Sequence, residues 1–286
     1  SQLYGGTYNL FAHAMPNMGI EVRFGSGDDP AAIEALIDEN TKAVYAETEG
    51  NPNGNVVDIE AFAAIAHRHG VPLIVDNTVP TPVLWRPIEH GADIVIHSLT
   101  KAMGGHGTTV GGVIVDSGNF PWAKHAEKYP MLTEPDPSYH GVVYTDALGP
   151  AAYIGRCRVA PLRNMGAALS PMNAFLLMQG IETVPLRMAR HGENALAVAE
   201  HLKAHPGVTW VKYAGLSDSP YYSLVQKYMG GNAGGILSFG IKGGEEAGAK
   251  FIDALGLITR LVNIGDAKSL ACHPASTTHR QLNDEE

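Results

Sequence analysis

Three short and almost wholly apolar runs constrain the fold of this chain more than any other feature. They are AVYAE at 43–47, PLIVD at 72–76 and DIVIH at 93–97. Runs of this kind are typical of strands that are covered on both faces. Stretches with helical spacing lie at 29–40, before the first run, and at 58–69, between the first two. This order predicts repeated strand–helix–strand units and an α/β fold whose mostly parallel sheet has helices on both sides.

The predicted helix at 58–69 has clear start and stop signals. Asp58 can cap its N-terminus, and Gly70 can end it. Further strands are predicted at 20–24 (IEVRF) and 112–115 (GVIV). In such a sheet, the carboxyl ends of the parallel strands meet at one edge, and ligands bind there.

The stretch 119–149 has no clear period and is rich in Pro, Tyr and Trp. We predict that it is a long surface loop or insertion. Phe120, Trp122 and Tyr144 are expected to be exposed in this region, where they would belong to a subunit interface or to a lid over the substrate.

The chain is predicted to divide near residue 182. A strongly helical stretch covers 168–205, and Gly180 and Pro185 are expected to break or kink it. We expect a large domain at 1–181 and a smaller C-terminal α/β domain at 182–286. The second domain contains weaker signals, namely strands at 209–213, 235–240 and 257–262 and a helix at 245–255.

The composition disfavours several classes of protein. Lys and Arg number 20 against 29 Asp and Glu, a net charge of −9, so neither nucleic acid nor membrane is expected as a partner. No apolar run reaches the length of about 18 residues that a membrane-spanning helix needs. Cys157 and Cys272 are the two cysteines, which make no disulfide framework, and a cytoplasmic location is expected.

Polar side chains follow the predicted strands at the points where these end. Asp76 closes PLIVD, and Ser98, Thr100 and Lys101 follow DIVIH directly. Asn51 comes a few residues after AVYAE. Because the carboxyl ends of parallel strands meet at one edge, these groups are expected to converge on one crevice.

This combination favours pyridoxal phosphate as a cofactor. The cofactor needs a lysine for a Schiff base and a carboxylate that keeps its pyridine nitrogen protonated. It also needs donors for its phosphate and an aromatic ring on which to stack. Lys101, Asp76, Ser98 with Thr100, and Tyr4 can supply these groups.

Each of these residues also has a simpler interpretation. Asp76 can be a helix cap, Lys101 a solvated side chain and Tyr4 a surface aromatic residue. Asn51 and Pro52 first indicate a turn. The residues alone leave both interpretations open.

Metal and nucleotide sites find less support. The sequence has neither HExxH nor paired cysteines at ligand spacing, and the pair His273 and His279 is a weak candidate, so no metal is expected. GxxxxGK[ST] is absent, and no GxGxxG follows a strand, which disfavours a nucleotide site.

Five segments resemble the Cys/Met-metabolism family of pyridoxal-phosphate enzymes. The most specific match is HSLTK at 97–101 with GGHG at 104–107. Within the family, 104–118 and 263–270 are most similar to O-acetylhomoserine sulfhydrylases, since γ-lyases more commonly have Ser in place of Asn263. The five segments are LYGGTYNLF (3–11), ETEGNPNGNVVDI (47–59), VDNTVPTPVLWRPIEHGADIVIHSLTKAMGGHG (75–107), GAALSPMNAFLLMQGIETVPLRM (166–188) and NIGDAKSLACHPASTTH (263–279).

The resemblance implies an aspartate-aminotransferase-like large domain (PLP fold type I), and it assigns roles to matching residues. Lys101 corresponds to the lysine that forms the Schiff base with pyridoxal phosphate. Asp76 corresponds to the partner of the pyridine nitrogen. Tyr4 corresponds to the ring that stacks on the cofactor and helps to move protons.

Further roles follow from the same resemblance. Asn51 corresponds to the residue near the 3′-oxygen of the cofactor, and Ser98 and Thr100 correspond to the phosphate ligands. Asn263 and the backbone near Ser269 lie where the amino-acid end of the substrate is held.

The resemblance also implies parts of the site beyond this chain. The family's Gly-rich phosphate loop, and a Tyr/Arg pair from a neighbouring subunit, belong before Ser1. The arginine that binds the substrate carboxylate belongs after Glu286. Because the chain begins inside a motif-like segment, we interpret it as an excerpt of a longer protein. We expect a homo-oligomer, a dimer of dimers with shared active sites.

The expected reaction is γ-replacement on O-acetyl-L-homoserine. Sulfide or a small thiol would replace acetate, giving homocysteine or methionine, and Lys101 would be the base that removes the α-proton and then a β-proton. The nearest alternative is a γ-lyase that releases a keto acid, ammonia and a thiol. A noncatalytic fragment that lacks the carboxylate-binding arginine is another.

Overall fold

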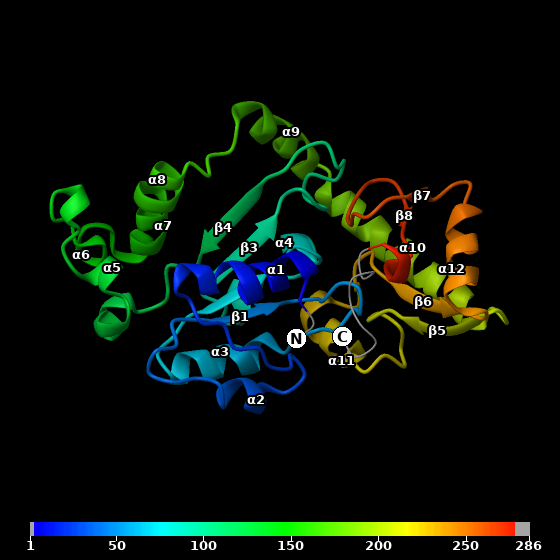
Figure 1. The fold of residues 1–286 in the computed structure, drawn as a ribbon, viewed down its shortest axis with the longest axis horizontal. Coiled ribbons are helices and arrows are strands. Elements are labelled where there is room, and N and C mark those ends of the chain that lie inside the picture. Colours follow the sequence, from blue (N-terminus) through cyan, green and yellow to red (C-terminus); the bar gives the residue numbers. More distant parts are fainter. Residues whose placement is uncertain (1–2, 278–286) are drawn as a thin grey trace.

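The computed structural model describes residues 3–277, which contain a central four-stranded sheet (Figure 1). β1, β2 and β3 are parallel, and β4 is antiparallel to β3. The sheet is therefore mixed, and most of its pairings are parallel, as predicted. In their hydrogen-bonded order, the strands are β1 (Val44–Glu47), β2 (Leu73–Asp76), β3 (Ile94–Ser98) and β4 (Gly112–Asp116).

The parallel register brings the carboxyl ends of β1, β2 and β3 to one edge of the sheet. Glu47, which ends β1, lies beside Asp76, which ends β2. Asp76 lies in turn beside Ile96 of β3. β4 begins at the same edge, because Gly112 pairs with Ser98. The polar residues that follow the strands are therefore neighbours in space.

The predicted strand at 20–24 is wrong. This segment has no regular secondary structure, and side-chain contacts hold it in place of a strand partner. The Arg23 guanidinium donates to the carbonyl of Leu36 at 2.9 Å and forms ion pairs with Glu21 and Asp38.

Two helices lie on the same side of the sheet (Figure 1). α3 (Ile59–Arg68) begins where predicted, and its Asp58 cap accepts a hydrogen bond from the backbone N–H of Ala61 at 3.4 Å. α2 (Pro30–Glu34) is shorter than the predicted 29–40. The hydroxyl of Thr41 accepts a hydrogen bond from the backbone N–H of Asp38 at 3.0 Å, and this turn replaces the end of the predicted helix.

Residues 119–149 fold into short helices with a small core of their own. Phe120, Trp122 and Tyr144 are buried, and they pack with Tyr129. The prediction that these three aromatic residues are exposed at an interface or a lid is therefore wrong. Their rings cover one another: the ring centroids of Phe120 and Trp122 lie 4.6 Å apart. The helices of this insertion are η4 (Trp122–Lys128), α5 (Pro130–Thr133), η5 (Pro137–Tyr139) and α6 (Tyr144–Leu148).

The helical stretch predicted at 168–205 is divided into two helices. α9 (Pro171–Ile181) is capped by the hydroxyl of Ser170. α10 (Val184–Ala204) follows after a short break. Pro185 lies in the first turn of α10, where backbone N–H groups have no partner within the helix. Its missing N–H therefore costs no hydrogen bond. The predicted interruption is confirmed.

The other helical segments of the first 165 residues are short. In chain order they are α1 (Gly5–Asn9), η1 (Leu10–Ala14), η2 (Pro16–Met18), α4 (Thr81–Leu84), η3 (Pro87–His90), η6 (Gly149–Ala151), α7 (Ala152–Cys157), η7 (Arg158–Leu162) and α8 (Arg163–Met165).

After α10 the chain forms two small sheets. β5 (Val208–Lys212) and β6 (Ser238–Ile241) are antiparallel, whereas β7 (Thr259–Arg260) and β8 (Leu270–Ala271) are parallel. His279, of the weak metal candidate pair, lies outside the described residues, as does the end of the fifth matching segment. The helices of this part are α11 (Tyr222–Met229), α12 (Gly244–Asp253) and η8 (Pro274–Ser276).

The domain boundary near residue 182 remains a prediction. One buried core contains side chains from both sides of it, among them Val75 and Trp85 from the first part and Ala195, Tyr213 and Val225 from the second. No helix within residues 3–277 combines the length and the apolar character that crossing a membrane requires.

Glu49, just after β1, is a buried acid in apolar surroundings. The residue is only 2% exposed, and neither carboxyl oxygen has a hydrogen-bond partner among residues 3–277. A Cβ built on Gly234 would lie 3.8 Å from Oε2 of Glu49, 3.9 Å from Leu84 and 4.0 Å from Met188. Burial raises the pKa of Glu49 to about 8, so the neutral form of the acid predominates at physiological pH.

We predict that Glu49→Met stabilises the protein and that the gain grows with pH. Between about pH 5 and about pH 8, Glu49 has lost its proton in the unfolded chain but keeps it in the folded protein. The contribution of Glu49 to the free energy of unfolding therefore falls by roughly 1.4 kcal/mol per pH unit. Glu49→Met removes this loss, because its side chain does not titrate. Denaturant unfolding of both proteins across this pH range measures the difference.

Glu200→Met, which removes an exposed carboxylate from α10, is the matched control and should leave the pH dependence of the wild type in place. A constant free-energy difference between Glu49→Met and the wild type at every pH would contradict the assignment.

Candidate active site

Lys101 lies three residues after the end of β3, on a turn at residues 101–105, the Lys101 turn. Its backbone N–H donates to the carbonyl of Ser98 at 3.1 Å, and its own carbonyl accepts from Gly105 at 2.8 Å. Its Nζ donates to Oδ1 of Asn263 at 2.6 Å. The side chain is partly buried, and burial lowers the pKa of the Lys101 amine. The structure therefore brings together two predicted residues that are 162 positions apart.

Tyr4 is the second predicted residue near this amine. The Nζ atom of Lys101 lies 6.0 Å from the centroid of the Tyr4 ring, and this ring is exposed. The backbone N–H of Tyr4 donates to both carboxyl oxygens of Glu47, at 2.9 and 3.1 Å, which fixes the start of α1 beside the end of β1.

Glu47 is a residue that sequence reasoning missed. Burial raises its pKa to about 7, the N–H of Tyr4 opposes this rise, and the charge of the neighbouring Asp76 adds to it. The sequence contained a signal, since Glu47 is the polar residue that closes the apolar run at 43–47. A carboxyl group that titrates near neutral pH therefore stands next to the predicted cofactor residues.

Asp76 and Ser98 are joined through the hydroxyl of Thr78. Oδ1 of Asp76 accepts from the backbone N–H of Thr78 at 2.8 Å, and Oγ1 of Thr78 accepts from the backbone N–H of Ser98 at 2.8 Å. Oδ2 of Asp76 and Oγ of Ser98 make no hydrogen bond within residues 3–277, so both atoms are free to contact a ligand. A backbone hydrogen bond, from the N–H of Lys101 to the carbonyl of Ser98, extends this series of contacts to Lys101.

The other predicted residues contribute less clearly. The hydroxyl of Thr100 donates to the carbonyl of Gly111 at 3.3 Å and accepts from its N–H at 3.1 Å, so it is engaged with the backbone before β4. Asn51 lies on the turn after β1 and makes no side-chain hydrogen bond in the described part of the chain. Ser269 is exposed, and its carbonyl accepts from the N–H of Thr259. No hydrogen bond joins Asn51 or Ser269 to Lys101 among the described residues.

Two further titratable residues near this edge of the sheet, His97 and Asp266, are ones that sequence reasoning missed. Nδ1 of the buried His97 lies 3.0 Å from the carbonyl of Asn77, and burial lowers the pKa of His97. Asp266 is buried beside the turn, where its Oδ2 would lie 3.2 Å from a Cβ on Gly107. Their strand and loop positions alone gave no strong signal.

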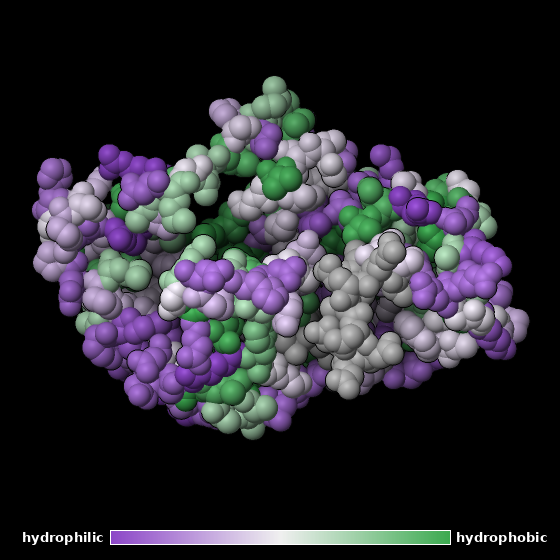
Figure 2. All heavy atoms as spheres, viewed as in Figure 1, coloured by the Kyte–Doolittle hydropathy of each residue, from purple (hydrophilic) through white to green (hydrophobic). Residues whose placement is uncertain are grey.

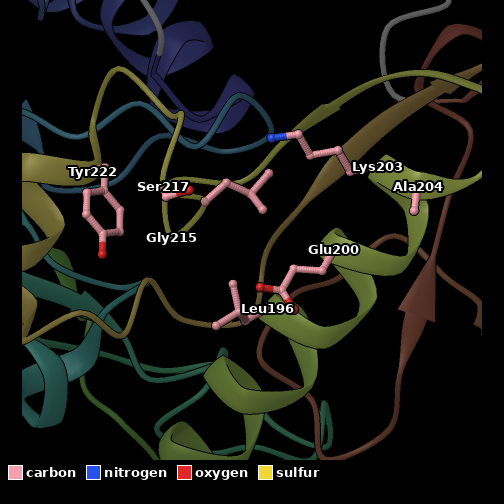
Figure 3. Close-up of a pocket in the computed structure, with 8 residues that line it drawn as sticks. Leu196, Glu200, Lys203, Ala204, Gly215, Ser217 and Tyr222 are labelled. Atoms are coloured by element: carbon pink, nitrogen blue, oxygen red, sulfur yellow. The ribbon is translucent and has the colours of Figure 1, made fainter.

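Hollows elsewhere in the described part of the chain contain none of the predicted site residues. No group of three or more His, Cys, Asp or Glu side chains within residues 3–277 could hold a metal ion. A surface hollow of about 430 Å³ lies between α10 and the segment after β5, lined by residues that include Glu200, Lys203, Ser217 and Tyr222 (Figure 3). Its lining contains none of the predicted site residues.

The groups around Lys101 fit pyridoxal phosphate. A Schiff base forms only from a neutral amine, and partial burial favours the neutral form of Lys101. The free oxygens of Asp76 and Ser98 suit a pyridine N–H and a phosphate. The exposed face of Tyr4 is open for stacking on a flat ring.

Comparison with known proteins gives consistent results. The sequence model of the family described as Cys/Met metabolism PLP-dependent enzyme matches residues 1–286. A homocysteine synthase of Schizosaccharomyces pombe is 53% identical over 287 residues, which cover 100% of this chain and 67% of that protein. An O-acetyl-L-homoserine sulfhydrylase of Leptospira meyeri is 51% identical over 99% of this chain and 65% of its own length.

A solved structure extends the similarity to the fold. A protein of Campylobacter jejuni, described as an O-acetylhomoserine (thiol)-lyase, superposes with a TM-score of 0.94 at 41% identity. The match covers 99% of this chain and 68% of the other, which contains a pyridoxyl-lysine phosphate. This chain thus spans about two thirds of the length of its relatives. With Lys101 placed among groups that suit the cofactor, these matches show that the chain belongs to the pyridoxal-phosphate-dependent enzymes of Cys/Met metabolism.

Proposed function

We propose that this chain catalyses γ-replacement on O-acetyl-L-homoserine, in which sulfide or a small thiol takes the place of acetate. The product with sulfide is homocysteine. The observation that carries the proposal is the hydrogen bond from Nζ of Lys101 to Asn263, next to the ring of Tyr4, in a chain about half identical to O-acetylhomoserine sulfhydrylases.

The proposed cofactor site uses the carboxyl edge of the sheet in an aspartate-aminotransferase-type fold. Lys101 would hold pyridoxal phosphate through Nζ, Asp76 would bind its pyridine nitrogen, and Tyr4 would stack on its ring. Ser98, with Thr100, would bind the phosphate. When bound, the cofactor supplies an electron sink for negative charge on carbon atoms of the substrate.

Asn51 is proposed to bind near the 3′-oxygen of the cofactor. It stands on the turn that leaves β1 at this same edge, and its amide group has no other hydrogen bond within residues 3–277. Asn263 and the backbone near Ser269 are proposed to hold the amino-acid end of the substrate. Oδ1 of Asn263 already accepts one N–H from Lys101, which leaves its amide N–H₂ group for a substrate carboxylate.

Lys101 is the proposed base. A lysine amine takes up a proton only in its neutral form, and the partial burial of this side chain favours that form. The hydrogen bond to Asn263 fixes the direction of Nζ, so that its lone pair can point to the α-carbon and then to the β-carbon of a bound substrate. Acetate leaves from the γ-carbon, and sulfide adds there.

We also propose that the protein is a cytoplasmic homo-oligomer with small-molecule substrates. Cys157 and Cys272 are free thiols, which suits a reducing compartment. Met172, Phe175 and Met178 of α9 are exposed apolar side chains. Figure 2 shows hydrophobic surface on this part of the molecule, which suits contact with another subunit.

The first test is product analysis. We expect the protein to convert O-acetyl-L-homoserine and sulfide into equal amounts of homocysteine and acetate, with little keto acid in the absence of sulfide. Lys101→Ala should lower the rate by at least about 10²-fold, because the base and the cofactor anchor are lost. Lys242→Ala, which changes an exposed lysine, is the matched control. Rapid release of keto acid and ammonia without sulfide would instead support a γ-lyase.

The second test places a negative charge beside the amine. In Asn263→Asp, a carboxylate would favour the ammonium form of Lys101 and raise its pKa. Attachment of pyridoxal phosphate to the cofactor-free protein should then be slow at neutral pH, with its rate–pH curve displaced upward. The growth of visible absorbance after mixing measures this rate.

Asn263→Ser is the control for the charge, since it removes the amide group without adding a carboxylate. Identical rate–pH curves for Asn263→Asp and Asn263→Ser would show that residue 263 does not set the charge state of Lys101 in solution.

A further inference from the structure

A single arginine of α10 contacts the backbone that carries Lys101. Nη1 of Arg187 donates to the carbonyl of Ala102 at 2.5 Å, and Nη2 donates to the carbonyls of Met103 at 3.3 Å and Gly180 at 2.7 Å. Ala102 and Met103 follow Lys101 directly in the sequence. The guanidinium therefore joins the turn at 101–105 to the end of α9.

The plane of the guanidinium is itself fixed. Nε of Arg187 donates to the hydroxyl of Thr183 at 3.0 Å, and that hydroxyl donates to the carbonyl of Gly180 at 3.2 Å. A flat group with donors on several sides can serve these acceptors at once, whereas a lysine ammonium offers a single centre of charge. The chemistry of this contact is therefore specific to arginine.

The segment 263–267 also contacts this turn. The backbone N–H of Ala267 donates to the carbonyl of Gly105 at 2.8 Å. A Cβ on Gly265 would lie 2.4 Å from the backbone N of Ala102, so the two backbones are in close contact. The same segment carries Asn263, the acceptor for Nζ of Lys101.

The packing around Arg187 leaves little free space. Gly105 has a φ of +75°, and a Cβ there would lie 2.4 Å from Nη1 of Arg187. Burial lowers the pKa of Arg187, whereas the charge of the buried Asp266 raises it. Arg187 thus fills a fixed place between α10, the end of α9 and the Lys101 turn.

We propose that Arg187 is a positioning residue: its guanidinium fixes the Lys101 turn against α9 and α10, and so sets where Nζ lies relative to Asn263. Arg187 touches neither Nζ nor Tyr4 among the described contacts, and it acts through the backbone of Ala102 and Met103. This inference rests on the proposed function, because it assumes that Lys101 carries the cofactor.

The test compares Arg187→Met with the wild type, both loaded with pyridoxal phosphate. We expect the visible absorbance of the bound cofactor to change its pH dependence, with a midpoint displaced by at least about half a unit. We expect kcat to fall by about 10-fold to 10²-fold, because small displacements of a reacting group cost this much, while KM stays within about threefold.

Two variants separate position from charge. Arg187→Lys keeps the charge but not the planar set of donors, so it should recover only part of the absorbance shift. Arg190→Met removes an exposed arginine of the same helix, which pairs with Glu193, and it should behave as the wild type.

The outcomes are distinct. A wild-type midpoint and a wild-type kcat in Arg187→Met would overturn this inference alone, whereas a wild-type protein without visible absorbance would contradict the proposed function as well. If Arg187→Met does not fold, Thr183→Val replaces it, since loss of the hydroxyl frees the guanidinium plane. Thr183→Val should shift the midpoint in the same direction by a smaller amount. An unshifted Thr183→Val would reduce Arg187 to a structural residue and overturn the inference.

Discussion

The candidate active site depends on the hydrogen bond between Nζ of Lys101 and Oδ1 of Asn263. This bond joins the turn after β3 to Asn263, which lies 162 residues later in the sequence. The lysine side chain could not hold this position on its own, because it has several freely rotating torsions. The contact is formed because Arg187 of α10 binds the Lys101 turn and the end of α9, while the segment 263–267 also contacts this turn.

Titratable groups whose pKa values are shifted by burial lie together at this edge of the sheet. Lys101 has a lowered pKa and Glu47 a raised one, and each change moves the group toward its neutral form near physiological pH. Asp76 lies between them in the sheet register, next to Glu47. A proton on Glu47 removes a repulsive charge beside the carboxylate of Asp76. Such clusters of displaced pKa values are typical of sites that move protons.

Local pattern predicted much of the fold. The apolar runs gave β1, β2 and β3, and the Asp58 cap gave the start of α3, because burial and capping act over a few residues. The strand prediction at 20–24 was wrong because Arg23 binds Asp38 and the carbonyl of Leu36, and an alternating pattern does not reveal these contacts. Phe120, Trp122 and Tyr144 were misjudged for a related reason: a small aromatic core depends on which rings meet in space, and an irregular sequence does not reveal this.

For the site too, local pattern predicted some residues, and residues that depend on contacts in space were missed. Lys101, Asp76 and Ser98 could be proposed because they lie at or just after strand ends. Tyr4 could be proposed because the cofactor needs an aromatic ring, and the family resemblance supplied Asn263. Glu47, His97 and Arg187 were missed, since their importance comes from burial and from contacts with backbone groups. The sequence gives no sign that Arg187 differs from other residues of its helix. Its role follows only from its hydrogen bonds to carbonyl groups of the Lys101 turn.

The central claim is that Lys101 is the residue that binds pyridoxal phosphate. Borohydride reduction of the cofactor-loaded protein, followed by proteolysis and mass spectrometry of the peptides, tests it most directly. We predict a single pyridoxyl-phosphate adduct, and we predict that the modified peptide contains HSLTK with the added mass on Lys101. An adduct on any other lysine with Lys101 unmodified would contradict the account.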